Sequence, residues 1–434
     1  MSNLSLLNRS LKSVWHPCTQ MKQHELYPLV PIQKGEGVWL FDTDGKRYLD
    51  AVSSWWVNLF GHNNPRIKDA IKKQLDTLEH VMLAGFTHEP VIDLSEKLAR
   101  LTGLGHAFYA SDGASATEIA LKMSFHYWRN TGRSSKTKFI SLQNSYHGET
   151  LGALSVTDVA IFKDTYAPLL LQSAQMPSPD FRLAKDSMDS EEWALFCADA
   201  LENYLEMHHE KIAAFIIEPL VQCAAGMGMY HPAYLRRASE ICNQYDVHLI
   251  ADEIAVGFGR TGTMFACEYA GVFPDFICLS KGITGGYLPL SVVLTTDKVY
   301  QAFYDDSTIK GFLHSHSYTG NPLACSAALS TLAIFETDNV IEKNKEKAAY
   351  LNSKMQTLTH LPIAHMRHQG MIWAFDIKTN NGKFSTDCYA EALKQGLLIR
   401  PIGNTVYLMP PYTITETEID FMLQATANAI KASI

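Results

Sequence analysis

The chain has 434 residues, a formal net charge of −8, a hydrophobic content of 47% and a charged content of 19%. This length exceeds one ordinary hydrophobic core, so we expect two domains, or one large domain and a smaller one. The negative charge, which comes without any basic run, argues against nucleic acid or an anionic membrane as a partner. We expect a cytoplasmic protein, because the eight cysteines form no C-x-x-C motif and the N-terminal residues lack the apolar core of a signal peptide.

The first strand signal, at residues 107–110, is followed by a glycine turn at 112–114 and then by a helical pattern. Ser115 and Glu118 have the spacing of a capping box, which places the helix start at Ser115. A glycine turn before a helix presents backbone N–H groups and the positive end of the helix dipole, and both attract a phosphate. Taken alone, this segment is better explained as an ordinary strand-to-helix connection. The helix would bury one apolar face, formed by Ala116, Ile119, Ala120, Met123 and Tyr127.

Four further apolar runs alternate with helical stretches, at 138–142, 213–217, 247–251 and 276–280. This alternation predicts an α/β fold, with parallel strands and helices on both faces of the sheet. Residues 291–296 follow the last run closely and are a candidate for an added antiparallel strand. Ligands of such sheets bind outside the carboxyl ends of the strands, so the residues that directly follow each run are the candidates for a binding site.

Asp252 and Lys281 follow two of these runs. Burial at the sheet edge would lower the pKa of Lys281 and make its amine a nucleophile toward an aldehyde. An aspartate held against a ring nitrogen keeps a pyridine ring protonated, as pyridoxal 5'-phosphate requires of its protein. Each residue alone is a weak signal, since a helix cap explains the aspartate and a solvated surface charge explains the lysine. Together with the glycine turn, in this order, they predict a pyridoxal phosphate site.

Several further motifs in the chain do not predict a binding site. Residues 257–262 satisfy G-x-G-x-x-G, but they lack the following helix and acidic residue that a dinucleotide site needs. The pairs His208-His209 and His314-x-His316 have no cysteine or carboxylate at metal-ligand spacing. We therefore expect neither a nicotinamide or flavin site nor a metal.

The predicted secondary structure changes after Cys325, where a long helical passage is followed by shorter strands around 371–377 and 405–409. This change indicates a second domain of ordinary size. We expect an N-terminal segment that belongs to the small domain, a large cofactor-binding domain and a C-terminal part of the small domain, at residues 1–54, 55–325 and 326–434.

Short motifs occur in a fixed order between Trp15 and Pro411, and the most specific are Trp15-His16-Pro17, residues 53–58, Tyr146-His147-Gly148, residues 251–254, Ser280-Lys281-Gly282, Gly320-Asn321-Pro322 and residues 407–411. This ordered set resembles the class III (ω-type) pyridoxal-phosphate aminotransferases of fold type I. The resemblance implies a large domain with a mainly parallel seven-stranded sheet and a smaller α/β domain built from both termini.

The resemblance also implies roles for residues around the cofactor. Lys281 is similar to the lysine that binds the cofactor covalently and moves the proton, and Asp252 to the partner of the ring nitrogen. Tyr146 would stack on one face of the ring and Ile254 would press on the opposite face. Glu218 is similar to an acidic residue that lies near the cofactor in fold relatives.

For the cofactor phosphate, the resemblance implies N–H groups from Gly113 and Ala114. Ser317 resembles a hydroxyl that reaches the phosphate from the neighbouring subunit, which implies a homodimer with shared active sites. Asp112 departs from the serine that is common at this turn, and an acid beside a phosphate is tolerable only if its side chain turns away.

For the substrate, the resemblance implies that Arg400 holds a carboxylate, a task that suits its planar guanidinium. Trp55 and Trp56 would form walls around an aliphatic chain, with Tyr407 nearby and Cys18 where relatives often have a substrate-contacting tyrosine. Core aromatics are the competing interpretation, because adjacent tryptophans on a strand point to opposite faces.

The branch of the family that the chain resembles most acts in biotin synthesis, so the expected substrates are S-adenosylmethionine and 8-amino-7-oxononanoate. Cys18 and Ile402 depart from the pattern of that branch, and lysine or another ω-amine stays an alternative donor. Two rival functions stay open, namely a racemase or decarboxylase with the same cofactor and a ligand-binding relative without chemistry.

Overall fold

The computed structural model describes residues 2–27, 29–185 and 187–434. The chain forms two compact units, which we call unit 1 (residues 1–65, 343–367 and 371–434) and unit 2 (residues 66–342 and 368–370). The ranges expected from the sequence, 1–54, 55–325 and 326–434, stay a prediction.

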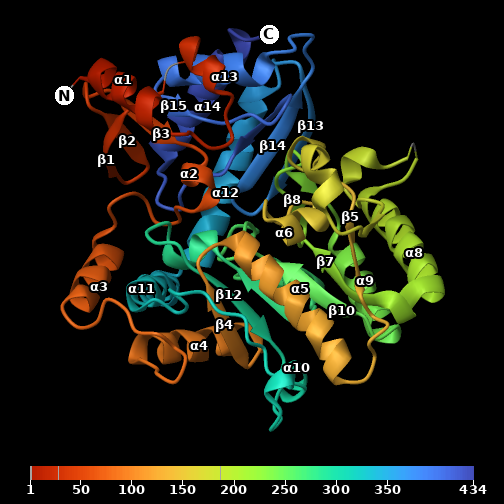
Figure 1. Ribbon diagram of the computed structural model, residues 1–434. Helices are drawn as coiled ribbons and strands as arrows, with labels where there is room; N and C mark the ends of the chain where they lie inside the picture. Colours follow the sequence, from red (N-terminus) through yellow and green to blue (C-terminus); the bar gives the residue numbers. More distant parts are fainter. Residues whose placement is uncertain (1, 28, 186) are drawn as a thin grey trace. The chain divides into compact units, whose positions relative to one another are not determined.

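A seven-stranded sheet in the order β4-β12-β11-β10-β7-β5-β6 forms the centre of unit 2 (Figure 1). β12 runs antiparallel to both of its neighbours, and the remaining paired strands are parallel. This topology confirms the expected α/β fold with a mainly parallel sheet and an added antiparallel strand. The strands are β4 (His106–Ala110), β5 (Lys138–Leu142), β6 (Ala174–Met176), β7 (Ile212–Ile217), β10 (His248–Asp252), β11 (Phe276–Leu279) and β12 (Ser291–Thr295).

The central strands consist of continuous apolar runs because both of their faces are covered. Every side chain of β7, β10, β11 and β12 is buried. A parallel sheet that is covered on both faces selects such runs instead of alternating patterns. This is the physical reason that the sequence indicated these strands to within one or two residues.

Helix α5 (Gly113–Asn130) lies across one face of this sheet (Figure 1). Its indole donor Trp128 Nε1 bonds the carbonyl oxygen of Ala213 in β7 at 2.9 Å. The apolar face predicted from the sequence is buried in the core of unit 2. The further helices that lie at least partly in unit 2 are α3 (Pro65–Leu75), α4 (Glu89–Thr102), α6 (Leu151–Ser155), α7 (Ala160–Lys163), α8 (Ser190–His208), α9 (Pro232–Gln244), α10 (Asp297–Gln301), α11 (Pro322–Asp338) and α12 (Val340–Met355), and a small hairpin joins β8 (Val221–Gln222) to β9 (Gly228–Met229).

The start of α5 corrects one expectation. The helix begins at Gly113, and its N-cap is Asp112, whose Oδ1 accepts from the backbone N–H of Ser115 at 2.9 Å. Glu118 does not reach back to close a capping box but accepts from the backbone N–H of Gly152 at 2.9 Å. The prediction of a Ser115–Glu118 box was therefore wrong, because an aspartate three residues earlier caps a helix as well as a serine does.

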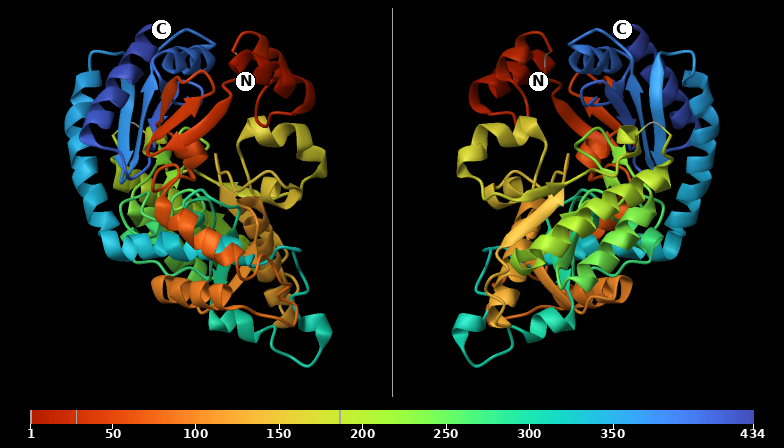
Figure 2. Two further views of the ribbon diagram at one scale, coloured as in Figure 1. Left: turned by 90° about the vertical axis from the view of Figure 1, so that its left-hand side faces the viewer. Right: turned by 90° about the vertical axis from the view of Figure 1, so that its right-hand side faces the viewer.

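Unit 1 holds a four-stranded sheet in the order β1-β2-β3-β15 and a three-stranded sheet in the order β13-β14-β16. Helix α12 lies beside α14 (Glu416–Lys431), where Lys354 Nζ is 3.5 Å from Asp420 Oδ1 (Figure 2). The remaining elements are α1 (Asn3–Ser13), β1 (Ile32–Glu36), β2 (Trp39–Asp42), β3 (Arg47–Asp50), α2 (Ser53–Trp56), β13 (Ile363–Gln369), β14 (Ile372–Ile377), α13 (Phe384–Lys394), β15 (Leu397–Leu398) and β16 (Thr405–Leu408). In the part of the chain that the structure describes, no helix is both long and apolar enough to cross a membrane.

Candidate active site

The carboxyl ends of β4, β5, β7, β10 and β11 lie at one edge of the sheet in unit 2. β4 and β11 both run antiparallel to the strand between them, so they are parallel to each other. Gly113, Tyr146, Glu218, Asp252 and Lys281 end these strands or follow them within four residues. The sheet therefore gathers the cofactor residues predicted from distant parts of the sequence at the edge where such folds bind ligands.

Asp252 is a buried carboxylate at the end of β10. Its side chain belongs to a residue that is only 4% exposed. His147 Nδ1 lies 2.7 Å from Asp252 Oδ2, and the backbone N–H of Ile254 donates to Oδ1 at 3.1 Å. A carboxylate has about four acceptor positions, so these two contacts leave capacity for a further donor such as a protonated ring nitrogen. The sequence indicated His147 only as part of the Tyr146-His147-Gly148 motif, and its contact with Asp252 was not predicted.

Glu218 lies next to the Asp252–His147 pair and is 5% exposed. It accepts from the backbone N–H of Tyr146 at 2.9 Å and from that of Cys223 at 3.1 Å. Burial raises the pKa of Glu218 to about 7, against the lowering effect of His147. Glu218 thus anchors the backbone of Tyr146 and titrates near neutral pH.

Lys281 is half-buried and begins the short 3-10 helix Lys281–Thr284 directly after β11. Asp252 is paired with Cys278 in the parallel register of β10 and β11, so Lys281 follows the strand position opposite the carboxylate by only three positions. Burial lowers the pKa of Lys281, while the charge of Asp252 acts in the opposite direction. A lowered pKa increases the fraction of neutral amine, which is the nucleophilic form.

The first turn of α5 forms the third part of the set. Gly113 and Ala114 are its first two residues, where backbone N–H groups lie outside the hydrogen-bond ladder of the helix. A Cβ built on Gly113 would lie 3.0 Å from Cγ2 of Ile254, so the turn and Ile254 are in close contact. The exposed Asp112 turns its carboxylate onto Ser115 and not into this turn. The condition that an acid at this position must turn away is therefore met.

Ser317 is exposed on the loop before α11. In the same loop, His314 Nε2 contacts His316 Nε2 at 2.9 Å, and Lys122 Nζ of α5 contacts His314 Nδ1 at 2.7 Å. Among the described residues, no group of three or more histidines, cysteines or carboxylates has a geometry that could hold a metal ion.

The predicted substrate residues lie in unit 1 and contact one another. Trp56 is buried and donates from Nε1 to the hydroxyl of Tyr407 at 3.1 Å. Trp55 is 42% exposed, and the guanidinium carbon of Arg400 lies 4.9 Å from its ring centre. Arg400 also donates to the carbonyl oxygen of Cys18 at 2.9 Å. All five predicted residues are thus joined in two small groups.

The two tryptophans do not lie on a strand. Residues 53–56, which we call the left-handed turn, have φ angles of 51°, 47°, 74° and 73°. A left-handed conformation costs an L-residue about 1 to 2 kcal/mol, and it is normally adopted by single residues. A run of four such residues needs strong tertiary contacts, and strain of this kind concentrates at functional sites.

Comparison with known proteins identifies the family. The model of the family described as "Aminotransferase class-III" matches residues 20–430. The chain belongs to this family. Class III aminotransferases depend on pyridoxal 5'-phosphate, and this aminotransferase therefore uses the same cofactor.

Two similar proteins carry the same name. The chain is 49% identical over 96% of its length to the adenosylmethionine-8-amino-7-oxononanoate aminotransferase of Helicobacter pylori, of which it covers 95%. It is 40% identical to the enzyme of that name from Geobacter sulfurreducens, with 96% of each chain covered.

Two solved structures of transaminases have the same fold as this chain. The enzyme of the same name from Methanocaldococcus jannaschii superimposes with a TM-score of 0.93 at 38% identity, with 99% of each chain covered. A PLP-bound amine transaminase from an uncultivated Pseudomonas species has a TM-score of 0.92 at 32% identity, with 97% of this chain and 99% of the transaminase covered.

The residues at the sheet edge fit the cofactor of this aminotransferase. A buried carboxylate bonded to His147 suits a protonated pyridine nitrogen, and the lowered pKa of Lys281 suits an amine that must attack an aldehyde. The first turn of α5 offers N–H groups and a positive dipole end for the phosphate.

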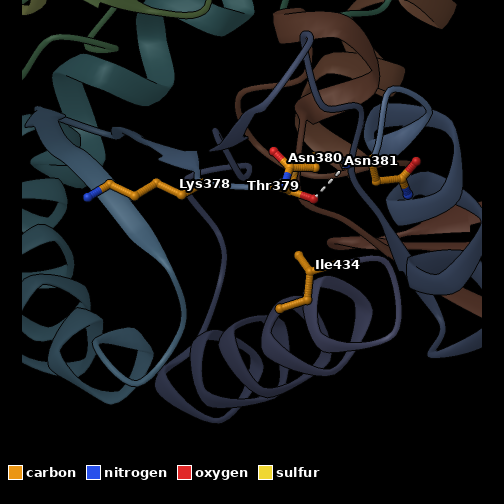
Figure 3. Close-up of a pocket in the computed structure, with 5 residues that line it drawn as sticks. All are labelled: Lys378, Thr379, Asn380, Asn381 and Ile434. Atoms are coloured by element: carbon orange, nitrogen blue, oxygen red, sulfur yellow. Dashed lines mark hydrogen bonds between the residues drawn. The ribbon is translucent and has the colours of Figure 1, made fainter.

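A separate pocket lies in unit 1 and contains none of the predicted residues (Figure 3). The side chains of Lys378, Thr379, Asn380, Asn381 and Ile434 line it. Polar atoms of its lining bond to neighbouring protein groups: Thr379 Oγ1 accepts from the backbone N–H of Asn381 at 3.1 Å, and Asn381 Nδ2 donates to Asp387 Oδ2 at 2.9 Å. We assign it no part in the aminotransferase reaction.

Proposed function

We propose that this aminotransferase transfers an amino group from S-adenosylmethionine to 8-amino-7-oxononanoate, giving 7,8-diaminononanoate for biotin synthesis. The observation that carries the proposal is the convergence of Lys281 and the Asp252–His147 pair at one sheet edge, in a chain 40 to 49% identical to enzymes named for these substrates.

The residues of unit 2 divide the chemistry. When bound, pyridoxal phosphate supplies an aldehyde that takes up the amino group and a ring that withdraws electrons. Asp252 holds a proton on the ring nitrogen, and His147 orients Asp252 through their 2.7 Å contact. Lys281 Nζ removes the proton from the amine-bearing carbon of the substrate and returns it at the opposite end of the transfer. The first turn of α5 holds the phosphate, together with Ser317 of the partner subunit.

The residues of unit 1 recognise the substrate. Arg400 binds the carboxylate of 8-amino-7-oxononanoate through its planar guanidinium, which already lies over Trp55. Trp55, Trp56 and Tyr407 contact the aliphatic chain. Cys18 meets the substrate through its backbone or its thiol, where relatives often have a tyrosine.

The assembly proposed for this aminotransferase is a cytoplasmic homodimer. Support comes from the exposed Ser317, which would complete the phosphate site of the neighbouring subunit. Large apolar side chains are exposed in the same loop and at residues 82–86, and exposed apolar side chains of this kind support an interface with a second subunit. They are Ile309, Leu313, Tyr318, Met82 and Phe86.

Two measurements test the proposal. Borohydride reduction of the cofactor-loaded enzyme followed by peptide mapping should label Lys281, and an unlabelled Lys281 would contradict the cofactor chemistry. Single-turnover mixing with S-adenosylmethionine should remove the visible absorbance of the bound cofactor. If lysine does so and S-adenosylmethionine does not, the donor assignment is wrong.

A further inference from the structure

One buried carboxylate holds Ser54 in the left-handed turn at residues 53–56. Asp50 ends β3 with no exposed surface and accepts at Oδ1 from the backbone N–H of Ser54 at 2.9 Å. Its Oδ2 accepts from the hydroxyl of Ser54 at 2.7 Å. The backbone and the side chain of one strained residue are therefore fixed by the same group.

His62 lies against the second oxygen of Asp50, and the backbone N–H of Val52 donates to Oδ1 at 3.4 Å. His62 Nε2 lies 3.0 Å from Asp50 Oδ2, and its Nδ1 lies 3.1 Å from the side-chain amide nitrogen of Asn58. An amide N–H that donates to Nδ1 leaves the proton of the neutral ring on Nε2, where it points at the carboxylate.

The position of His62 is itself fixed by the backbone. His62 and Gly37 exchange two hydrogen bonds, with N···O distances of 2.6 and 3.1 Å. A Cβ on Gly35 would lie 2.5 Å from Cβ of His62, a separation that real side chains do not adopt. The glycine thus allows the close approach that brings the imidazole to Asp50.

We propose that Asp50 and His62 are positioning residues for substrate recognition: they hold the left-handed turn, and through it they set the orientation of Trp55 and Trp56. They have no part in binding the cofactor. The inference rests on the proposed function, because it assigns these tryptophans to the aliphatic chain of 8-amino-7-oxononanoate.

The geometry explains why the turn needs this pair. Ser53 is tied to the carbonyl oxygen of Met409 at 2.7 Å, and Trp56 is tied to Tyr407 at 3.1 Å. Between these two anchors, Ser54 is held by Asp50, and Trp55 follows directly. A strained residue persists only where its surroundings determine its conformation. Loss of the Asp50 contacts would let residues 54 and 55 relax and would turn the Trp55 ring.

The test compares His62→Leu with the conservative His62→Gln in the cofactor-loaded enzyme. We expect His62→Leu to raise KM for 8-amino-7-oxononanoate about tenfold, as for the loss of one hydrogen bond to a charged group, with kcat within about twofold of wild type. The visible spectrum and the affinity for pyridoxal phosphate should not change. His62→Gln, which keeps an N–H donor, should recover most of the loss.

A matched control is His365→Leu, which removes a second histidine–carboxylate contact of unit 1, between His365 Nδ1 and Asp376 Oδ2 at 2.9 Å. It should leave KM unchanged. Ser54→Ala is the second variant if His62→Leu does not fold, and it should alter the near-ultraviolet circular dichroism of the tryptophans as well as raise KM.

Three results would overturn the inference: an unchanged KM in His62→Leu and Ser54→Ala, a parallel loss of cofactor affinity, or an equal effect in His365→Leu. Failure of the proposed function is distinguishable, because the wild type would then not convert 8-amino-7-oxononanoate. The same variants are in that case compared on the carboxylate-bearing substrate that the wild type does convert.

Discussion

At the scale of single residues, Asp252 depends on a partner that is not adjacent to it in the sequence. The imidazole of His147 lies within 2.7 Å of its carboxylate, and both side chains are almost completely buried. The histidine therefore fixes the orientation of the carboxylate that we propose to face the ring nitrogen of the cofactor.

We expect His147→Leu to weaken binding of pyridoxal phosphate and to lower kcat. A hydrogen bond to a charged group contributes about 1.5 to 3 kcal/mol, which corresponds to roughly ten- to a hundredfold in affinity. Absorbance titration of the unloaded enzyme with the cofactor measures this loss. His147→Gln keeps a donor and should lose less, whereas equal affinity of His147→Leu and wild type would contradict the role of the histidine.

A second carboxylate of the same segment has a structural task. Glu253 has no exposed surface and accepts from the backbone N–H groups of Ala266 and Cys267 at 2.9 and 2.8 Å. Burial raises the pKa of Glu253 from its ordinary value of 4.5 to about 7, and the two backbone donors act in the opposite direction.

Glu253 should make the protein less stable as the pH rises from about 4.5 to 7. In this interval the folded state binds more protons than the unfolded state, so the free energy of unfolding falls with increasing pH. Glu253→Gln should flatten this slope, as measured by urea unfolding at a series of pH values. Glu191→Gln, an exposed residue on α8, serves as the control. A slope in Glu253→Gln as steep as that of wild type would refute the prediction.

At the scale of elements, the first turn of α5 combines a good helix cap with an unfavourable charge. Asp112 satisfies the backbone N–H of Ser115, but its negative charge precedes the turn proposed to bind a phosphate. The exposed carboxylate points at Ser115, which limits the repulsion without removing it.

Asp112→Ser should therefore bind pyridoxal phosphate about two- to fivefold more tightly than wild type. Serine and aspartate cap helices about equally well, so the free energy of unfolding should change by less than about 0.5 kcal/mol. Asp189→Ser provides the control: Asp189 is the N-cap aspartate of α8, so its replacement should leave the affinity for pyridoxal phosphate unchanged. Weaker binding by Asp112→Ser would show that the carboxylate assists the phosphate site.

At the scale of the whole molecule, the assignment of Ser317 makes a dimer necessary for function. If Ser317 acts across the interface, two defective chains can complete each other. A chain with Lys281→Ala supplies an intact Ser317 to a partner with Ser317→Ala, whose own Lys281 is intact.

Mixed dimers of these two variants should regain one tight cofactor site per dimer. Each parent dimer should lack covalent attachment of the cofactor or bind it weakly. The readout is cofactor bound per chain after gel filtration, with sedimentation to verify the assembly. Chains that stay monomeric, or mixed dimers no better than the parents, would refute the proposed arrangement.

The sequence was sufficient for the sheet and for the residues at its edge. Parallel strands buried on both faces are continuous apolar runs, so the sequence alone predicted β7, β10 and β11. Because ligands bind at the carboxyl ends of such strands, Asp252 and Lys281 could be placed at one edge by chain order alone. The resemblance to class III aminotransferases, which the family match confirms, depended on motifs that are local in the sequence.

Only the tertiary structure could decide the partners and the backbone conformations at these sites. The pairing of His147 with Asp252 joins residues 105 positions apart, and the contact of Ser53 with Met409 spans 356 positions. The left-handed turn runs against the local preference of four L-residues, so no propensity could indicate it. Its conformation results from Asp50, Tyr407 and Met409, which meet only when the chain is folded.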